Sequence, residues 1–103
     1  MKRARLKLTL PEGLHARPAA QLVAAALRFR SRIRLCLGDR VADLRSILAV
    51  LMLGASVGAL LDLEVSGDDE DTALAAITQT FVDDQLGEVL DESSDLMGDR
   101  LRT

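Results

Sequence analysis

Apolar and polar residues alternate along several short stretches of the chain, which is the pattern of half-buried β-strands. The first such stretch, residues 3–10, places Ala4, Leu6, Leu8 and Leu10 on one face. Two later stretches are separated by a Gly-Asp pair that is typical of a hairpin turn. The predicted strands cover residues 3–10, 32–37, 40–42 and 59–65.

Three other segments carry apolar residues at helical spacing. In the first of them, Pro18 falls in the first turn, where proline is tolerated. In the second, Ser46 is placed to cap the N-terminus and Gly54 to end the helix. The third has acidic residues in its first turn, which the helix dipole favours. The predicted helices cover residues 16–29, residues 46–53, and a segment that starts at 68 or 69 and ends between 81 and 84.

The predicted order of elements is β, α, β, β, α, β, α. This order favours an α+β sandwich in which helices cover one face of a mainly antiparallel sheet. A chain of 103 residues has room for one domain, which we expect over residues 1–86. Residues 87–103 are polar, acidic and weakly periodic, and they predict a flexible C-terminal tail.

Composition excludes several classes of function. The chain has no Trp or Tyr, so base stacking on aromatic side chains is not a main binding mode and no nucleic-acid partner is expected. A single cysteine, Cys36, excludes an internal disulfide and a multi-cysteine zinc site. Neither a signal peptide nor a membrane span is apparent, which predicts a cytoplasmic protein without membrane insertion. Glycine-rich nucleotide loops are absent, and no cofactor is expected.

The net charge of −3 conceals a strong difference between the two halves of the chain. Residues 1–52 contain 11 basic and 3 acidic side chains, whereas residues 53–103 contain 2 basic and 13 acidic ones. If the fold keeps this separation at its surface, the basic part can steer an acidic partner or a phosphorylated group. In the alternative, charges from both halves mix on the surface of a small domain.

The only histidine, His15, lies between a predicted strand and the start of a predicted helix. A helix N-terminus presents unpaired N–H groups and the positive end of the dipole to an anion. Arg17 can add a guanidinium that suits phosphate oxygens, and a neutral imidazole can accept a phosphoryl group as a nucleophile. A lone histidine can also simply cap a helix or pack in a loop. A metal site and a catalytic triad both lack supporting residues.

The string GLHARPAAQLV, which contains His15, closely resembles the active-site segment of HPr, the histidine-containing phosphocarrier of the bacterial sugar phosphotransferase system. Two later strings, LRSILAVLMLGAS and LEVSGDDEDTALAAI, are similar to the family's regulatory serine segment and to its last strand and helix. The resemblance covers about residues 3–86. It implies an open-faced β-sandwich with four antiparallel strands covered on one face by three helices.

The resemblance also implies a function, which is that of a carrier and not of an enzyme. His15 would be phosphorylated at Nδ1, and Arg17 would contact the phosphoryl group. Family members take that group from enzyme I, which phosphoenolpyruvate charges, and deliver it to the enzyme IIA component of a sugar permease. A carrier for a nitrogen-related branch or for a dihydroxyacetone kinase relay is an alternative with the same chemistry. We expect a monomer.

Ser46 and its neighbours form a second region of interest. In some relatives the matching serine is phosphorylated by HPr kinase/phosphorylase, which gives the alternative of a regulatory binding module that contacts a transcription regulator. By the same resemblance, a partner-docking patch surrounds His15. Its predicted members are Ala20, Arg45, Ile47, Leu48 and Leu51.

Overall fold

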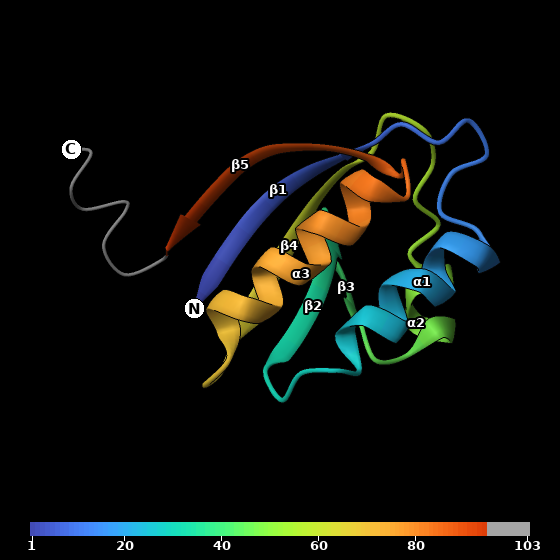
Figure 1. Cartoon of the computed structure of the whole chain (residues 1–103). Coiled ribbons are helices and arrows are strands. Elements are labelled where there is room, and N and C mark those ends of the chain that lie inside the picture. The colour runs from blue at the N-terminus through green and yellow to red at the C-terminus, as the bar shows by residue number, and fades with distance from the viewer. Residues whose placement is uncertain (95–103) are drawn as a thin grey trace.

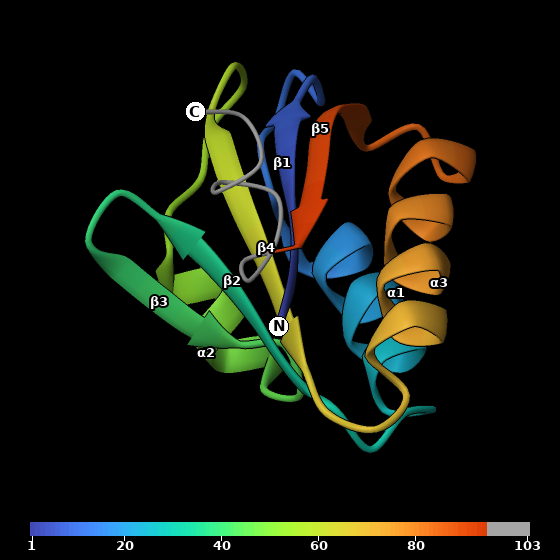
Figure 2. The same ribbon diagram turned by 90° about the vertical axis from the view of Figure 1, so that its left-hand side faces the viewer.

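The computed structural model describes residues 1–94, which form five strands and three helices. In chain order these are β1 (Lys2–Leu8), α1 (Ala16–Ala26), β2 (Arg32–Leu37), β3 (Arg40–Asp43), α2 (Ile47–Met52), β4 (Leu60–Ser66), α3 (Glu70–Asp83) and β5 (Gly87–Ser94). The strands make one sheet in the order β3-β2-β4-β1-β5, and every neighbouring pair is antiparallel. The three helices lie on one face of this sheet (Figures 1 and 2). The predicted α+β class and the open-faced sandwich are therefore confirmed.

The fifth strand is a correction to the expected sheet of four. Residues 87–94, which were predicted to belong to a flexible tail, pair with β1 along nearly its whole length (Figure 2). Their apolar pattern is weak because the strand lies at the edge of the sheet and none of residues 87–93 is buried. The strand therefore forms by backbone pairing with the edge strand β1. The apolar periodicity of a sequence does not reveal this kind of pairing. The rest of the predicted tail, residues 95–103, lies outside the described residues.

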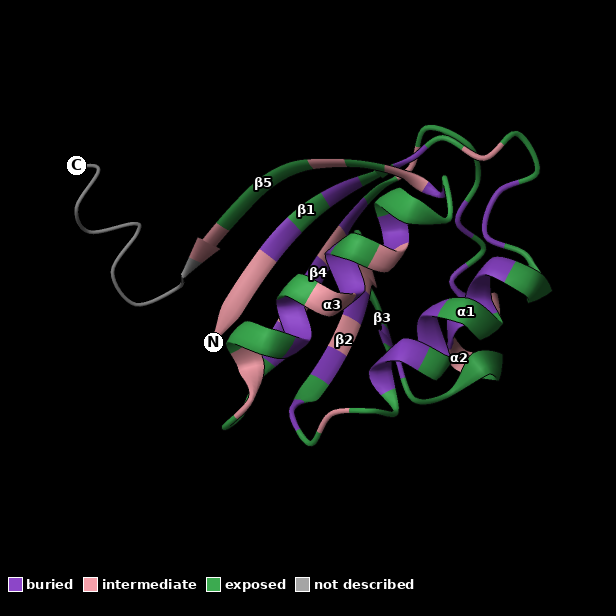
Figure 3. Cartoon of the chain, in the orientation of Figure 1, coloured by how far each residue is buried: buried purple, intermediate pink, exposed green. Residues whose placement is uncertain are grey.

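The core lies between the sheet and the helices and is almost entirely aliphatic. Inward-facing strand residues such as Leu6, Ile33 and Leu63 are fully buried, and Phe81 on α3 is the largest side chain among them. Figure 3 shows the alternation of buried and exposed positions along β1 and β2 and the buried stripe on α3. The strands behave as the alternation of the sequence predicts.

The first helix ends at Ala26, three residues before its predicted end. The chain tightens there, with Arg28 N donating to Ala25 O and Phe29 N donating to Ala26 O. The Arg45 guanidinium donates to the carbonyl oxygens of Phe29 and Ser31, beyond the helix end. A side chain distant in sequence therefore satisfies carbonyl groups in the loop that follows the helix.

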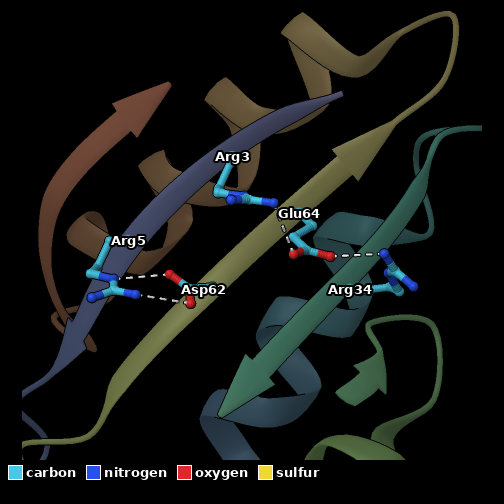
Figure 4. Close-up of polar contacts among 5 residues, drawn as sticks. All are labelled: Arg3, Arg5, Arg34, Asp62 and Glu64. Carbon is cyan, nitrogen blue, oxygen red and sulfur yellow. Dashed lines mark hydrogen bonds and ion pairs between the residues drawn. The ribbon is translucent and has the colours of Figure 1, made fainter. Parts of the chain in front are cut away.

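Charges from the two halves of the chain mix on the sheet face that is turned away from the helices. The acidic strand β4 lies between β1 and β2, which belong to the basic half. Arg5 donates two hydrogen bonds to Asp62, at 3.0 and 3.1 Å, and Asp62 raises the pKa of Arg5. Glu64 accepts from Arg34 at 2.8 Å and from Arg3 at 3.5 Å (Figure 4). On this face the charge separation of the sequence is cancelled.

Asp69, at the start of α3, connects that helix to the loop between α1 and β2. Its carboxylate accepts hydrogen bonds from Arg30 N and Ser31 N, both at 2.9 Å, and from Ser31 Oγ. These bonds favour the ionised form, and the hydrogen bond from Ser31 Oγ contributes most to lowering the pKa of Asp69. The folded state therefore binds fewer protons at this site than the unfolded state does.

Asp69→Asn should lower stability near neutral pH, because an amide nitrogen cannot accept a hydrogen bond from a backbone N–H. The ionised Asp69 contributes fully to the free energy of unfolding above the ordinary aspartate pKa of about 3.9. This contribution is lost as pH falls through the lower pKa of the folded state. We therefore expect the difference in urea midpoint between the unmodified chain and Asp69→Asn to become smaller as pH falls toward about 3. Asp68→Asn, at an exposed neighbouring carboxylate, is the matched control. An Asp69→Asn gap of equal size at both pH values would contradict the assignment.

Candidate functional site

A tight turn before α1 presents His15 to solvent. Gly13 adopts a positive φ of 75°, its amide donates to Leu10 O at 3.0 Å, and Leu14 N donates to Ala55 O at 3.0 Å. Leu14 is buried, which fixes the turn to the core. His15 follows as the N-cap residue of α1 with extended backbone, and its side chain is 44% exposed. The imidazole is therefore accessible to another molecule.

Gly13→Ala should destabilise the fold at this turn. A Cβ at this position would lie 2.6 Å from Ala55 O, and the backbone conformation is one that alanine rarely adopts. We expect a loss of about 1–3 kcal/mol in the free energy of unfolding, measured with urea. Gly38→Ala is the matched control, because Gly38 also has a positive φ of 61° but a Cβ there would meet nothing within 4 Å. Equal losses in the two variants would show that the close approach to Ala55 is unimportant.

The N-terminus of α1 supplies hydrogen-bond donors beside His15. The helix's first backbone bond is donated by Ala19 N to His15 O at 3.0 Å, so the amides of Ala16 and Arg17 come before the intrahelical ladder begins. Pro18 has no N–H, and no side chain caps the helix. Two donors and the positive end of the helix dipole are thus available to an anion at this position.

His15 and Arg17 line the same open depression, which has a volume of about 330 Å³. Its walls come from the loop after β1, from α1, and from the segment that joins α3 to β5. The lining residues are Leu10, His15, Arg17, Pro18, Gln21, Asp84 and Leu86. The two residues singled out in the sequence thus face one space that is large enough for a phosphoryl group.

Two carboxylates lie close to this positive site. Glu12 Oε1 is 3.5 Å from His15 Nε2, a contact that is an ion pair only when the ring is protonated, and Asp84 lines the depression. Within residues 1–94 no hydrogen bond engages His15 Nδ1. The ring nitrogen that the family resemblance implicates is therefore available for bonding.

Sequence reasoning did not assign four of the lining residues to the site, namely Leu10, Gln21, Asp84 and Leu86. Gln21 could have been found, because it is four residues after Arg17 and so shares a face of the same helix. Asp84 and Leu86 had no local signal, since they follow a helix about 70 residues away in the chain. The packing of α3 beside α1 brings the end of α3 and the segment after it to His15 (Figure 1).

Ser46 caps α2, as the sequence predicts. Its Oγ accepts a hydrogen bond from Ala49 N at 3.1 Å, and its side chain is exposed. Such a cap contributes about 1 kcal/mol to stability. The hydroxyl is therefore both structural and accessible.

The five residues of the predicted docking patch differ in their surroundings. Ala20, Ile47 and Leu48 are exposed, and Leu48 retains 65% of its accessible surface. Leu51 packs partly against the core, and the Arg45 guanidinium binds carbonyl groups of the chain itself. Sequence reasoning missed Met52 on α2, which is 72% exposed.

Other site chemistries find little support in the described part of the chain. Residues 1–94 contain no group of three or more His, Cys, Asp or Glu side chains that could hold a metal ion. The pKa of the Cys36 thiol is raised, chiefly by burial, which disfavours the reactive thiolate. Among the described helices, none is long and apolar enough to cross a membrane.

Comparison with known proteins agrees with the geometry of the site. A family model described as "PTS HPr component phosphorylation site" matches residues 2–83. The phosphocarrier protein HPr of Lysinibacillus sphaericus is 43% identical over 77 residues, which are 75% of this chain and 88% of the relative.

Two solved structures share the fold. The histidine-containing phosphocarrier protein of Mycoplasma superposes with a TM-score of 0.81 at 33% identity, covering 82% of this chain and 97% of that one. HPr of Thermoanaerobacter tengcongensis gives a TM-score of 0.76 at 34% identity, covering 87% of this chain and 100% of that one. This chain therefore belongs to the HPr family, the phosphocarrier proteins of the phosphotransferase system.

Proposed function

We propose that this chain accepts a phosphoryl group on His15 from phosphorylated enzyme I and passes it to an enzyme IIA component of a sugar permease. One observation carries the proposal. An exposed imidazole begins α1, and Arg17 lines the same depression. Membership of the HPr family supports the phosphotransferase system as the setting. The carrier acts in the cytoplasm and as a monomer in this proposal.

The transfer has two balanced steps. In the first, the lone pair of neutral His15 Nδ1 forms a bond to phosphorus while the bond between phosphorus and the donor breaks, and the donor keeps that electron pair. In the second, a nucleophile on the acceptor bonds to phosphorus and the N–P bond breaks, which returns the lone pair to His15. The amides of Ala16 and Arg17 and the Arg17 guanidinium stabilise the charge on the phosphoryl oxygens.

The proposed docking surface for both partners consists of Ala20, Ile47, Leu48 and Leu51, with Arg45 at its rim. The first lies on α1 and the next three on α2, and these helices pack against each other on the same side of the sheet (Figure 1). Exposed apolar side chains in a group are typical of protein contacts. Their position beside α1 would let a docked protein reach His15.

Incubation of the purified chain with enzyme I and phosphoenolpyruvate tests the proposal. Mass spectrometry should show the addition of one phosphoryl group, and brief acid treatment should remove it, because phosphohistidine is acid-labile and phosphoserine is not. An acid-stable adduct, or no adduct, would contradict transfer through His15.

Ser46 supports a second function, which is regulation through phosphorylation by an HPr kinase/phosphorylase. The observation that favours it is an exposed hydroxyl at the start of α2, adjacent to Ile47 and Leu48 of the proposed docking surface. A phosphate there would add about −1.5 to −2 charges to that surface. Docking of an acidic partner would then weaken.

A further inference from the structure

The strand β5 lies beyond the family match, which ends at residue 83. The strand pairs with β1 from Leu8↔Gly87 to Lys2↔Ser94, with one irregularity beside Arg5. It therefore covers the edge that β1 would otherwise expose.

β5 is held mainly by backbone pairing with β1, and the register also places opposite charges across from each other. The register sets Glu88 opposite Lys7 and Asp91 opposite Arg5. Within residues 87–93 the apolar contribution is small, because Val89 is half-buried and Leu90 is exposed. Cross-strand pairs of opposite charge contribute little individually, so we infer that this strand is held less firmly than the strands of the core.

The first residues of β5 are joined directly to the wall of the His15 depression. Leu86 is 2% exposed, lines that depression, and accepts a hydrogen bond from Thr9 N at 2.9 Å. Its own amide donates to Phe81 O at 2.9 Å. Gly87 follows immediately and lies so close to β1 that a Cβ there would overlap the Lys7 carbonyl oxygen. The ladder between β1 and β5 thus continues directly into the hydrogen bond from Thr9 N to Leu86 O, which helps to hold Leu86 together with its bond to Phe81 O.

We propose that β5 is a positioning strand for the His15 site, because its pairing with β1 holds Leu86 in place as one wall of the depression. Separation of β5 from β1 removes that wall and changes the environment of the imidazole. Leu86 is a positioning residue in this scheme and does not touch the phosphoryl group. The importance of this coupling for phosphoryl transfer rests on the proposed function. The coupling between the pairing of β5 and the environment of the His15 ring does not.

A charge-reversal cycle in the full-length chain tests the coupling. Glu88→Lys places like charges opposite each other, and the double variant Lys7→Glu/Glu88→Lys restores opposite charges. We expect hydrogen exchange at the β1 amides that bond to β5 to rise about threefold in the single variant and to return in the double. The NMR signals of the His15 ring should shift in the single variant and return to their original positions in the double variant. Glu92→Lys is the matched control, because Glu92 lies opposite the uncharged Ala4.

A second variant, Gly87→Val, displaces the start of the strand by steric overlap with the Lys7 carbonyl group and the Phe81 ring, and not by charge. It should raise the same exchange rates by at least about tenfold and shift the His15 ring signals further than Glu88→Lys does. Far-ultraviolet circular dichroism checks that the three helices remain. Faster exchange with unchanged His15 signals would overturn the proposal, as would unchanged exchange in both variants. Both readouts use the unphosphorylated chain, so failure of phosphoryl transfer alone would refute the proposed function and leave the coupling intact.

Discussion

His15→Ala is expected to abolish the acid-labile phosphoryl adduct that enzyme I and phosphoenolpyruvate form on this chain. His15 is the only histidine in the sequence, so no other imidazole can take its place. The amides of Ala16 and Arg17 remain in the variant, but they stabilise charge and cannot form a bond to phosphorus. The measurement is the mass of the chain before and after acid treatment.

The variant should fold, which makes its loss of the adduct interpretable. The His15 side chain is exposed and makes no capping hydrogen bond to α1, so its removal costs little stability. Ser46→Ala is the control, because it removes the other candidate phosphorylation site and should keep the acid-labile adduct. If His15→Ala still gained an acid-labile group, the phosphorylated atom would have to lie elsewhere.

Ser46→Asp is expected to slow phosphoryl acceptance from enzyme I by about tenfold or more. A carboxylate on the proposed docking surface repels an acidic partner, like charges in contact cost several kcal/mol, and each 1.4 kcal/mol is a factor of ten. True phosphoserine, with a larger charge, should slow the reaction by about a hundredfold. The initial rate of adduct formation at limiting enzyme I measures the effect.

Ser46→Asn separates charge from structure. Asparagine and aspartate both cap helices well and can accept the bond from Ala49 N that Ser46 now accepts at 3.1 Å. The fold and α2 should therefore be preserved in both variants, and only the aspartate should slow the reaction. A rate in Ser46→Asp equal to that of the unmodified chain, or equal losses in both variants, would contradict an electrostatic switch.

Most of the secondary structure followed from patterns that a few neighbouring residues carry. Alternation predicted the four strands β1 to β4, and helical spacing with a capping serine predicted α2 to within one residue at each end. The same local reasoning placed His15 at the start of α1, because Gly13 and Pro18 bracket the turn and the first helical residues. Backbone preference, capping and one-sided burial each depend on residues within a single turn or strand. They can therefore be predicted from the sequence without knowledge of the tertiary structure.

Features that depend on distant segments were not predictable in this way. The pairing of β5 requires the free edge of β1, which exists only once β4 occupies the other side. The position of Asp84 and Leu86 beside His15 requires α3 to pack along α1. The hydrogen bonds of Arg45 to carbonyl groups beyond α1 require the segment before α2 to lie beside the loop between α1 and β2.

The sequence by itself determined the elements, the helix start that presents His15, and the Ser46 cap, because each depends on residues within one turn or one strand. The tertiary structure alone decided which distant side chains complete the His15 depression, how the acidic and basic halves neutralise each other across the sheet, and that residues 87–94 are a strand. The physical reason is that strand pairing and helix packing join segments tens of residues apart, and their partners are defined only when the whole chain has folded.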